Sequence, residues 1–346
     1  MFIRNAWYVG AWSDEISLKP LVRRICNEPV VLFRDADGHS AALLDMCCHR
    51  GAPLHLGRVE AEGIVCGYHG LVFDRSGRCV RIPGQDRIPE RARVRAFPVV
   101  EQDGFIWIWM GGTDKADRNS IVCFPWQTDA ENWPNKHTVY SIKSAAMQMV
   151  DNLMDLTHLG YVHTSTIGGN PMIHVGAKMQ TEQTPTGLKF TRWMLNTPPP
   201  PTYIRAMGFE GRIDRVQIFE FVAPGCVLQF SGADDAGAYQ NGDVENSKLR
   251  FRLFHGLTPE TETSCHYFWT TLNGFRPNDP AATEGLFNEI AGAFNEDRTV
   301  VEAQQTRLSE LGEGGLVDIR TDAARLHMRR IMERLLAEET QVLAAE

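Results

Sequence analysis

Cys47-Cys48-His49-Arg50-Gly51 and Cys66-Gly67-Tyr68-His69-Gly70 are the two stretches that decide the fold of this chain. Each reads as a short loop that offers one thiolate and one imidazole, and sixteen residues separate His49 from Cys66. Two Cys and two His suit either a zinc site or a Rieske [2Fe–2S] cluster, in which two His replace two Cys on one iron. Zinc fingers group Cys with Cys and His with His, whereas here each loop mixes the two. The pattern therefore predicts a Rieske cluster, whose four ligands are Cys47, His49, Cys66 and His69.

The first ligand follows from the spacing within the first loop. Cys47 fits a Cys-x-His pattern, and Cys48 does not because it directly precedes His49. Glycines beside the loops let backbone N–H groups approach the cluster sulfides, and such hydrogen bonds raise the reduction potential. These glycines are Gly51, Gly67 and Gly70. The alternative is two surface loops with incidental Cys and His, which leaves four soft ligands at this spacing unexplained.

The composition is that of a globular protein with two domains. At 346 residues, 43% of them hydrophobic, the chain is long enough to build two cores. Its net charge of −8 argues against nucleic acid and anionic membranes as partners, and leaves room for electrostatic docking of a redox partner. No apolar run reaches about 18 residues, so no transmembrane helix is predicted. Eight Cys without a signal peptide favour a cytoplasmic protein that uses Cys for metal binding.

Residues 1–112 read as a small all-β domain that holds the cluster. Short apolar runs predict strands at 7–9, 29–34, 41–44, 71–73 and 105–109. Asp35-Ala36-Asp37-Gly38 is a hairpin-turn signal between two of these strands. Residues 113–135, which contain Asp, Asn, Pro and Trp, are predicted to form a linker.

Residues 136–346 add helical periodicity to the strand signals. Strands are predicted at 188–193 and 216–221, and helices at about 150–162, 282–311 and 321–344. The predicted fold class is therefore α+β, with an N-terminal all-β Rieske domain followed by a domain that combines a sheet with helices.

A second metal motif lies in the stretch Asp151-Asn152-Leu153-Met154-Asp155-Leu156-Thr157-His158-Leu159-Gly160-Tyr161-Val162-His163. Asn152, Asp155 and His158 are spaced i, i+3 and i+6, which places them on one face of the predicted helix. Gly160 lets the helix loosen, so that His163 can come round beside His158. Two imidazoles and one carboxylate form the facial triad of non-haem iron oxygenases, which leaves positions for O₂ and substrate. The alternative is a helix end with two surface His, but an electron-carrying cluster needs a site to supply.

The carboxylate of this triad must come from another part of the chain. An apolar stripe runs along the predicted helix of 282–311 at Leu286, Ile290, Phe294 and Val301. Asp297 falls within that stripe, and an acid on a buried face needs a partner such as a metal ion. A buried ion pair is the alternative role for Asp297. Glu296 and Glu302 point off the stripe and are predicted to be solvated.

The motifs resemble the oxygenase component of Rieske non-haem iron aromatic oxygenases, in the group of vanillate O-demethylase, dicamba O-demethylase and toluenesulfonate methyl-monooxygenase. The resemblance runs almost end to end and is most specific at the two metal motifs. Its segments are Arg4-Asn5-Ala6-Trp7-Tyr8-Val9, Cys66-Gly67-Tyr68-His69-Gly70-Leu71, Asp151-Asn152-Leu153-Met154-Asp155-Leu156-Thr157-His158, Thr258-Pro259-Glu260-Thr261-Glu262-Thr263, Glu296-Asp297 and Val300-Val301-Glu302-Ala303.

The resemblance implies a complete set of site residues. The cluster ligands would be Cys47, His49, Cys66 and His69, and the ligands of a mononuclear iron would be His158, His163 and Asp297. Asp155 would connect His69 of a neighbouring subunit to His158, so that electrons cross a subunit boundary. A carboxylate between two metal-bound imidazoles fixes their tautomers and orientation. Asp155 and Asn152 are therefore the candidate catalytic residues.

The resemblance also implies an architecture and partners. The second domain would have the helix-grip fold of the family, and the chain would form a ring-shaped homotrimer. A separate ferredoxin-type reductase, with FMN and its own [2Fe–2S] centre, would deliver electrons from NAD(P)H. No nucleic acid or membrane partner is implied.

Three residues are candidate substrate contacts. They are His255, Gln229 and Asn288. In the dicamba enzyme a His that matches the place of His255 resembles a contact to the substrate carboxylate. An imidazole with a pKa near neutrality could pair with a carboxylate or sulfonate in the same way. An aromatic residue lies near the place of Asn288 in that enzyme, and this departure argues against a dicamba-like substrate.

Three functions compete at this stage. The first is a monooxygenase of aromatic catabolism that O-demethylates a methoxylated aromatic acid and releases formaldehyde. The second is hydroxylation of the methyl group of an aryl sulfonate or carboxylate, or dihydroxylation of a ring. The third is a Rieske electron carrier fused to a ligand-binding domain without chemistry of its own, which the candidate iron triad argues against.

Overall fold

The two units of the molecule each have their own core. The computed structural model describes residues 1–241 and 244–345. The first unit holds Met1–Cys123 and Thr258–Glu262, and the second holds Phe124–Leu257 and the residues from Thr263 onward. The sequence-based domain bounds at residues 112 and 135 stay a prediction.

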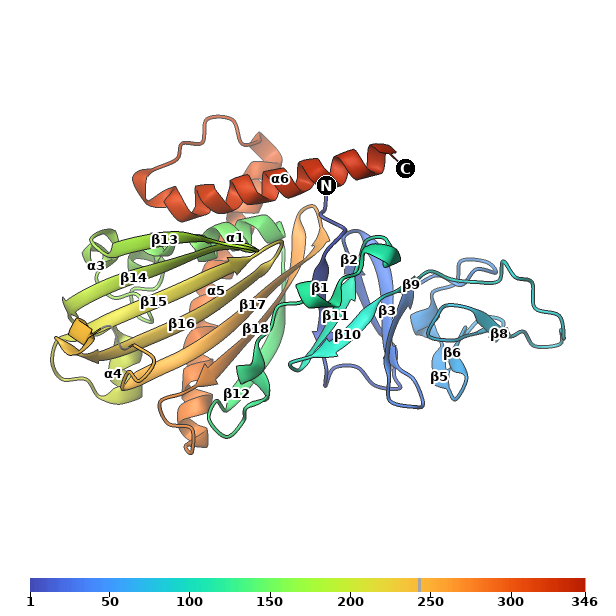
Figure 1. Ribbon diagram of the computed structural model, residues 1–346, viewed down its shortest axis with the longest axis horizontal. Coiled ribbons are helices and arrows are strands. Elements are labelled where there is room, and N and C mark those ends of the chain that lie inside the picture. Colours follow the sequence, from blue (N-terminus) through green and yellow to red (C-terminus); the bar gives the residue numbers. More distant parts are fainter. Residues whose placement is uncertain (242–243, 346) are drawn as a thin grey trace. The chain divides into compact units, whose positions relative to one another are not determined.

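The first unit is built from strands, as predicted. Its three sheets have the orders β1-β11-β10, β2-β3-β4-β9 and β5-β6-β7-β8 (Figure 1). The strands are β1 (Trp7–Trp12), β2 (Leu21–Ile25), β3 (Glu28–Arg34), β4 (Ser40–Leu44), β5 (Arg58–Glu60), β6 (Gly63–Val65), β7 (Val72–Phe73), β8 (Cys79–Arg81), β9 (Ala96–Phe97), β10 (Val99–Gln102) and β11 (Phe105–Trp109). Short 3-10 helices are η1 (Leu54–Leu56), η2 (Thr113–Lys115) and η3 (Arg118–Ser120).

The predicted hairpin at Asp35–Gly38 joins β3 to β4. Gly38 adopts a positive φ of 85° and its N–H donates to the carbonyl of Asp35 at 3.1 Å. The Asp35 carboxylate accepts from the N–H groups of Asp37 and His39. These bonds close the turn and fix the register in which Val31 pairs with Leu43.

The second unit is a seven-stranded sheet with helices. Its strand order is β12-β18-β17-β16-β15-β14-β13. The strands are β12 (Asn135–Ile142), β13 (Lys178–Thr184), β14 (Gly187–Thr197), β15 (Ile213–Val222), β16 (Cys226–Asp235), β17 (Leu249–Thr261) and β18 (Ser264–Asn273). The α-helices are α1 (Ala146–Met154), α2 (Leu159–Val162), α3 (Pro171–Val175), α4 (Pro201–Met207), α5 (Pro280–Leu311) and α6 (Ala323–Ala345). The 3-10 helices are η4 (Pro125–Thr128), η5 (Leu156–His158), η6 (Ala238–Asn241) and η7 (Arg320–Asp322).

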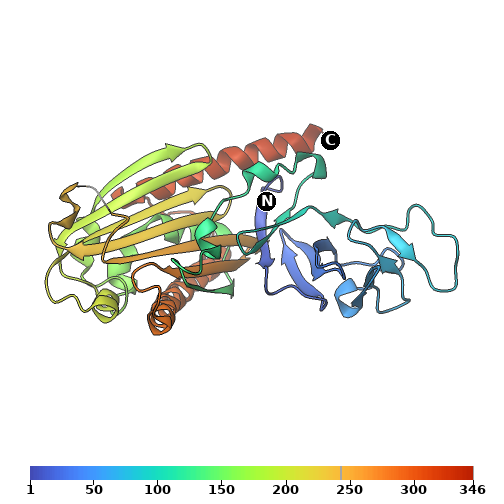
Figure 2. The same ribbon diagram turned by 60° about the horizontal axis from the view of Figure 1, so that its bottom comes forward.

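Helices α1 and α5 cover one face of this sheet, which we call the inner face. Both helices contact β18, and α5 also contacts β12. Figure 2 shows α5 passing beneath the strands. Helix α6 packs against α1 and β14, where Arg329 donates from Nε to both carboxylate oxygens of Asp151 at 2.9 and 3.1 Å. None of the helices in the described ranges is long and apolar enough to cross a membrane.

The register of the sheet places a polar row on its inner face. Arg192 of β14 pairs with Gln217 of β15, which in turn pairs with Ser231 of β16. Side chains alternate along a strand, so Arg215 and Phe219 lie on the same face as Gln217. Phe219 stacks near His255, whose ring meets Phe294 of α5, and this contact identifies the face as the inner one.

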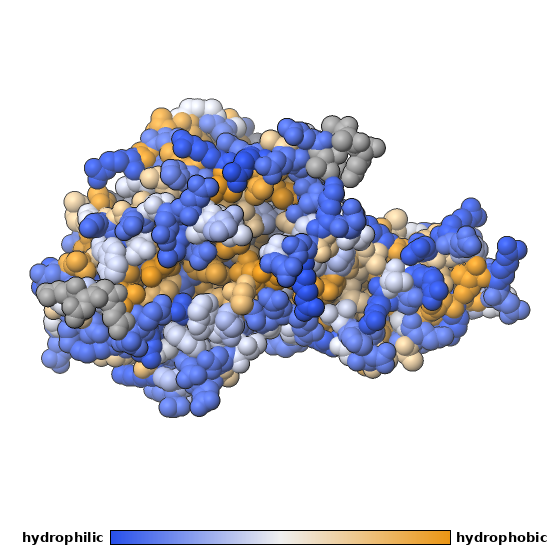
Figure 3. Space-filling view, in the orientation of Figure 1, coloured by the Kyte–Doolittle hydropathy of each residue, from blue (hydrophilic) through white to orange (hydrophobic). Residues whose placement is uncertain are grey.

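The opposite face of the sheet carries an apolar cluster of its own. Val216, Phe230 and Tyr239 form its buried part, and Trp193 and Ile218 pack against it half-buried. Figure 3 shows hydrophobic residues over the middle of the sheet and hydrophilic residues around them. The sheet therefore separates two layers of side chains, and the polar row lies in the one beneath the helices.

The helical structure predicted over about 150–162 is present, but it is divided at Asp155. Helix α1 ends at Met154, and Asp155 has extended backbone angles of φ −130° and ψ 107°. The Asp155 carboxylate accepts from the N–H of Thr157 at 2.9 Å and so starts a new helical turn at η5. An Asp side chain that bonds the backbone two residues ahead competes with helix continuation, which accounts for the break.

The predicted long helix is confirmed as α5. Asp279 caps its N-terminus by accepting from the N–H groups of Ala281 and Ala282 at 3.0 and 3.2 Å, and Pro280 occupies the first helical position. Asp297 is buried on the same face as the predicted apolar stripe. The second predicted helix of the C-terminal part is likewise confirmed as α6.

Glycines of the second unit provide a stability test. In Gly292→Ala the new Cβ meets no atom within 4 Å, and alanine is the better helix former, so we expect the free energy of unfolding to rise by about 1 kcal/mol. In Gly187→Ala the Cβ would lie 1.9 Å from the Phe221 carbonyl oxygen, so we expect a loss of roughly 1–3 kcal/mol. Urea unfolding followed by circular dichroism measures both, and equal effects of the two variants would contradict the described packing.

Candidate metal centres

The two loops with Cys and His leave strands of two different sheets of the first unit. Cys47 follows β4, and Cys66 lies between β6 and β7. The N–H of Cys47 donates to the Ala52 carbonyl and that of Cys66 to the Leu71 carbonyl, both at 2.8 Å. Each loop is thus closed by a backbone bond that starts at its cysteine.

Cysteine and histidine differ in exposure in these loops. Cys47 and Cys66 are both 2% exposed and belong to one apolar core cluster, in which their thiols interact. The rings of His49 and His69 are exposed and pack edge to face, 4.6 Å between centroids. Burial, opposed in part by backbone hydrogen bonding, raises the pKa of the Cys47 thiol to about 12. Iron binding must therefore displace a proton from this residue.

Glycines bring the two loops close together. Gly51 and Gly70 have φ values of 72° and 73°, and their N–H groups donate to the carbonyls of Cys47 and Cys66. A Cβ on Gly67 would lie 2.7 Å from the Leu56 carbonyl oxygen of the facing loop. The N–H groups of Gly51 and Gly70 therefore close the loops, and the expected hydrogen bonds from backbone N–H groups to the cluster sulfides stay a prediction.

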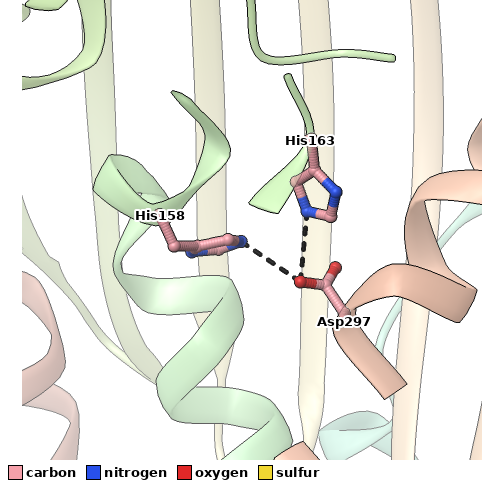
Figure 4. A group of neighbouring side chains, drawn as sticks. All are labelled: His158, His163 and Asp297. Atoms are coloured by element: carbon pink, nitrogen blue, oxygen red, sulfur yellow. Dashed lines mark hydrogen bonds and ion pairs between the residues drawn. The ribbon is translucent and has the colours of Figure 1, made fainter. Parts of the chain in front are cut away.

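The second centre lies in the second unit, where three side chains meet (Figure 4). His158 comes from η5, His163 follows α2, and Asp297 projects from α5. The Oδ1 atom of Asp297 lies 3.3 Å from Nε2 of His158 and 3.1 Å from Nε2 of His163. The ligand atoms of all three lie within 4.8 Å of one another. The structure therefore brings together the three residues that the sequence assigns to iron.

Hydrogen bonds orient these three side chains from outside. Nδ1 of His158 lies 2.7 Å from the Asp155 carbonyl oxygen, and Nδ1 of His163 lies 2.7 Å from Oε2 of Glu296. Imidazoles that donate from Nδ1 turn their Nε2 atoms towards the shared point. Asn152 donates to Oδ1 of Asp297 at 3.0 Å and fixes the carboxylate.

The charges of the triad favour a cation. Burial opposes ionisation of Asp297, but hydrogen bonds from His158 and His163 outweigh it and lower the pKa of the carboxyl group. The side chains of Asp297 and His163 are 6% and 1% exposed. An ionised carboxylate in such surroundings needs a positive partner.

Both donor sets fit the metals that the sequence predicts. Two imidazole nitrogens and one carboxylate oxygen on one side of a shared point match a facial triad for Fe(II). Paired buried thiols opposite exposed imidazoles match a cluster with Cys on one iron and His on the other. The match to the two metals rests on where the donor atoms lie and not only on how many there are.

Two predictions about glutamates are wrong. Glu296 accepts from Nδ1 of His163 and from Oγ1 of Thr166 at 3.1 Å, so it is half-buried and holds a triad residue. Glu302 accepts from the Lys143 N–H and from Arg298 Nε, both at 3.0 Å. Helical spacing predicts both side chains to be solvated because it places residues only relative to the apolar stripe of their own helix. It cannot show which hydrogen-bond partners a neighbouring segment supplies.

Gly160 also has a different role from the one predicted. A Cβ at this position would lie 2.3 Å from Cα of Pro171, where α2 meets α3. Gly160 therefore permits close packing behind His163, and the break in the helix is caused by Asp155 instead. The carboxylate of Asp155 bonds Thr157 within this chain, so its predicted bridging role stays a prediction.

The candidate substrate residues divide into two groups. His255 is fully buried and bonds Tyr267 through Nδ1 at 2.7 Å and Gln229 through Nε2 at 3.0 Å. Burial lowers the pKa of His255 to about 3, so the condition for an ionic contact to a carboxylate or sulfonate is not met and the ring is uncharged. Asn288 is exposed on α5 and bonds Glu284 at 3.3 Å, so the structure does not bring it to His255 and Gln229.

Two family models match the chain. Residues 6–98 match the Rieske [2Fe-2S] domain. Residues 142–338 match the vanillate O-demethylase oxygenase C-terminal domain. The two matches together include every predicted metal ligand.

Relatives of known function match over almost the whole chain. The toluene-4-sulfonate monooxygenase system iron-sulfur subunit of Comamonas testosteroni is 39% identical over 342 residues, which cover 98% of this chain and 98% of that subunit. The vanillate O-demethylase oxygenase subunit of a Pseudomonas species is 37% identical over 350 residues, covering 100% and 98%. The crystal structure of dicamba monooxygenase with non-heme iron and dicamba superimposes with a TM-score of 0.81 at 30% identity, covering 100% and 99%. This agreement confirms the predicted α+β class with its Rieske and helix-grip domains.

Gly168 gives a test of the second centre that leaves the first untouched. In Gly168→Ala the Cβ would lie 1.9 Å from the Leu159 carbonyl oxygen and 2.8 Å from that of His163, so we expect displacement of this imidazole. Iron should fall from about three to about two per chain, while the cluster absorbance stays unchanged.

The matched control is Gly211→Ala, where the new Cβ meets no atom within 4 Å. Metal analysis and visible spectra of the two purified variants make the comparison. Full iron content in Gly168→Ala would show that the turn after His163 does not position a metal ligand.

Proposed function

This chain belongs to the family of Rieske oxygenase components that includes the vanillate O-demethylase oxygenase subunit, and on that basis we propose that it O-demethylates a methoxylated aromatic acid. The observation that carries the proposal is the meeting of His158, His163 and Asp297, within 4.8 Å, in a chain that also has a Rieske domain. The protein carries a [2Fe–2S] cluster and a mononuclear non-haem iron.

The proposed reaction balances with O₂, two electrons and two protons. One oxygen atom is inserted into a C–H bond of the methoxy group, and the other leaves as water. The resulting hemiacetal breaks its C–O bond to give a phenol and formaldehyde. The bound iron supplies the activation of O₂ for this oxidation.

The residues of the chain have separate tasks in this reaction. Nδ1 of His158 and Nδ1 of His163 keep their protons on the bonds to the Asp155 carbonyl and to Glu296, so that both Nε2 atoms serve the metal. Asn152 holds the carboxylate of Asp297 in its ligating position. These bonds keep the triad in place while the substrate is oxidised.

Neutral side chains are the proposed contacts to the aromatic substrate. His255 and Gln229 bond each other on the inner face of the sheet and offer directional hydrogen bonds. Because His255 carries no charge, it orients a polar group of the substrate without pairing as an ion. The aromatic ring would lie against the neighbouring apolar side chains of the same face.

A second reaction is favoured by one comparison. The identity of 39% with a toluene-4-sulfonate monooxygenase subunit supports hydroxylation of the methyl group of an aryl sulfonate or carboxylate. Ring dihydroxylation needs the same metals but leaves no formaldehyde. A fused electron carrier without oxygenase chemistry would hold about two irons per chain, whereas the proposed oxygenase holds about three.

The electron route is proposed from the family resemblance. A cytoplasmic ferredoxin-type reductase with FMN takes electrons from NAD(P)H and passes them to the cluster. In a homotrimer, His69 of one protomer approaches Asp155 of its neighbour, and Asp155 relays the electron to His158. The exposed ring of His69 is compatible with such a contact.

Product analysis tests the proposed reaction. We expect the iron-loaded protein, with a surrogate reductase and NADH, to release formaldehyde from vanillate or a close methoxyarene, in equal amounts to the phenol formed. Benzylic alcohol from 4-toluenesulfonate without formaldehyde would instead establish the second reaction. Chromatographic analysis of the products from a panel of methoxy- and methyl-arenes distinguishes the two reactions. If the protein oxidises neither class of compound, both proposed reactions are contradicted.

Asp155→Asn tests the proposed relay. The amide keeps the size of the carboxylate and can still accept from Thr157, so folding and both metals should persist, whereas product formed in a single turnover of the reduced protein should fall by roughly 100-fold. Metal analysis, cluster spectra and rapid quench measure the two effects separately. Normal turnover with both metals bound would remove Asp155 from the route.

A further inference from the structure

A buried arginine on the inner face of the sheet lacks partners for part of its side chain. Arg215 of β15 is 1% exposed. Its Nη2 donates to the Ile167 carbonyl at 3.3 Å, and its guanidinium carbon lies 4.9 Å from the centre of the Tyr203 ring. Within the ranges that the structure describes, Nε and Nη1 have no hydrogen-bond partner, although both atoms are buried.

This arrangement is unfavourable unless a ligand completes it. Arginine keeps its charge at all pH values of interest, and a buried charge without a counter-ion costs several kcal/mol. Among the described residues, no carboxylate forms an ion pair with Arg215. An unpaired buried donor also loses the hydrogen bonds that water gave it in the unfolded chain. A group that brings negative charge and oxygen acceptors would meet both needs.

Two other arginines of the sheet have more partners than Arg215. Arg192, on the same face, donates to the carbonyls of Leu156 and His174 and to Oε1 of Gln217. Arg252, half-buried on the opposite face, is paired with Glu245 and lies over an aromatic ring, and one of its nitrogens, Nε, has no partner in the described ranges. Arg215 differs from both because two of its nitrogens are left over.

The position of Arg215 links it to the proposed reaction site. Ile167, which accepts from Arg215, belongs to the turn after His163, and in that turn the N–H of Gly168 donates to the His163 carbonyl at 3.0 Å. Along β15, Arg215 is two residues from Gln217 and so lies on the same face.

The polar row continues from there to the proposed substrate contacts. Ser231 pairs with Gln217, Gln229 donates to Oγ of Ser231 at 2.9 Å, and Gln229 bonds His255 at 3.0 Å. Arg192 forms the other end of this row, and Arg215 lies beside the row, two residues from Gln217 along β15. His255 is neutral, whereas Arg215 is permanently charged.

We propose that Arg215 binds the anionic group of the aromatic substrate, a carboxylate or a sulfonate, through its free Nε and Nη1 donors, a role that rests on the function proposed above. Oxygen atoms of either anion accept charge-assisted hydrogen bonds from a guanidinium. Arg215 would then select aromatic acids over neutral aromatic compounds of the same shape.

Equilibrium binding without turnover tests this role. The iron-loaded protein, without reductase, is titrated by calorimetry with 4-toluenesulfonate and with vanillate, and separately with the neutral analogues 4-toluenesulfonamide and vanillamide. In Arg215→Met we expect the affinity for the preferred anion to fall by about ten- to hundredfold, because a charge-assisted hydrogen bond is lost. The affinity for its amide should change by less than about twofold.

The control is Arg252→Met, which makes the same substitution on the other face of the same sheet. It should leave unchanged the ratio of the affinity for the anion to the affinity for its amide, here called the anion-to-amide ratio. A methionine at position 215 removes a buried charge, so the protein is expected to keep its iron and its thermal midpoint. Arg215→Lys, which keeps the charge but has fewer donors and a shorter reach, provides a second measure and should lower the ratio by at least about threefold.

Three results would overturn the role of Arg215. An unchanged anion-to-amide ratio in Arg215→Met would make the residue purely structural, and an equal loss for anion and amide would mean that the substitution only distorts the pocket. If the methionine variant does not fold, an anion-to-amide ratio in Arg215→Lys equal to that of the unsubstituted protein would likewise make the residue purely structural. Failure of the unsubstituted protein to bind any of the four compounds would overturn the proposed substrate class, and the anion site with it.

Discussion

The ionised carboxylate of Asp297 is the constraint on which the second unit depends. It lies on the buried side of α5, 134 residues from His163 in sequence, and is stabilised there because two imidazoles and an Asn amide face it. A buried carboxylate without such partners costs several kcal/mol. The positions of η5, the turn after α2 and the middle of α5 are therefore coupled, and the site forms only when all three are in place.

The first unit solves a different problem, which is to bury thiols and present imidazoles. Cys47 and Cys66 belong to the apolar core, whereas His49 and His69 remain at the surface. In the predicted cluster, the iron held by the two histidines is thus the one that another protein surface can approach. This asymmetry follows from loop geometry, because backbone bonds at each cysteine turn the next residues outward.

The sequence predicted the main elements and the residues that meet at the second centre, and it failed where tertiary contacts decide. Motif spacing pointed to His158 and His163 and the apolar stripe pointed to Asp297, and the structure brings the three together. The role of Glu296 could not be read from helical periodicity, since its partner comes from a loop more than a hundred residues earlier. Asn288 was assigned to the pocket by resemblance, although its place two residues after Leu286 puts it off the buried stripe of α5. The same helical periodicity that pointed to Asp297 would have excluded Asn288 from the pocket.

The inner face of the sheet shows how a pocket can combine direction with charge selection. Burial removes the charge of His255, because an imidazole can lose its proton, but the same burial cannot discharge Arg215. The neutral groups of the polar row therefore orient a ligand at little electrostatic cost, whereas Arg215 gains a compensating charge only when an anion binds. Such a site favours the binding of acids because, without an anion, the buried charge of the arginine has no partner.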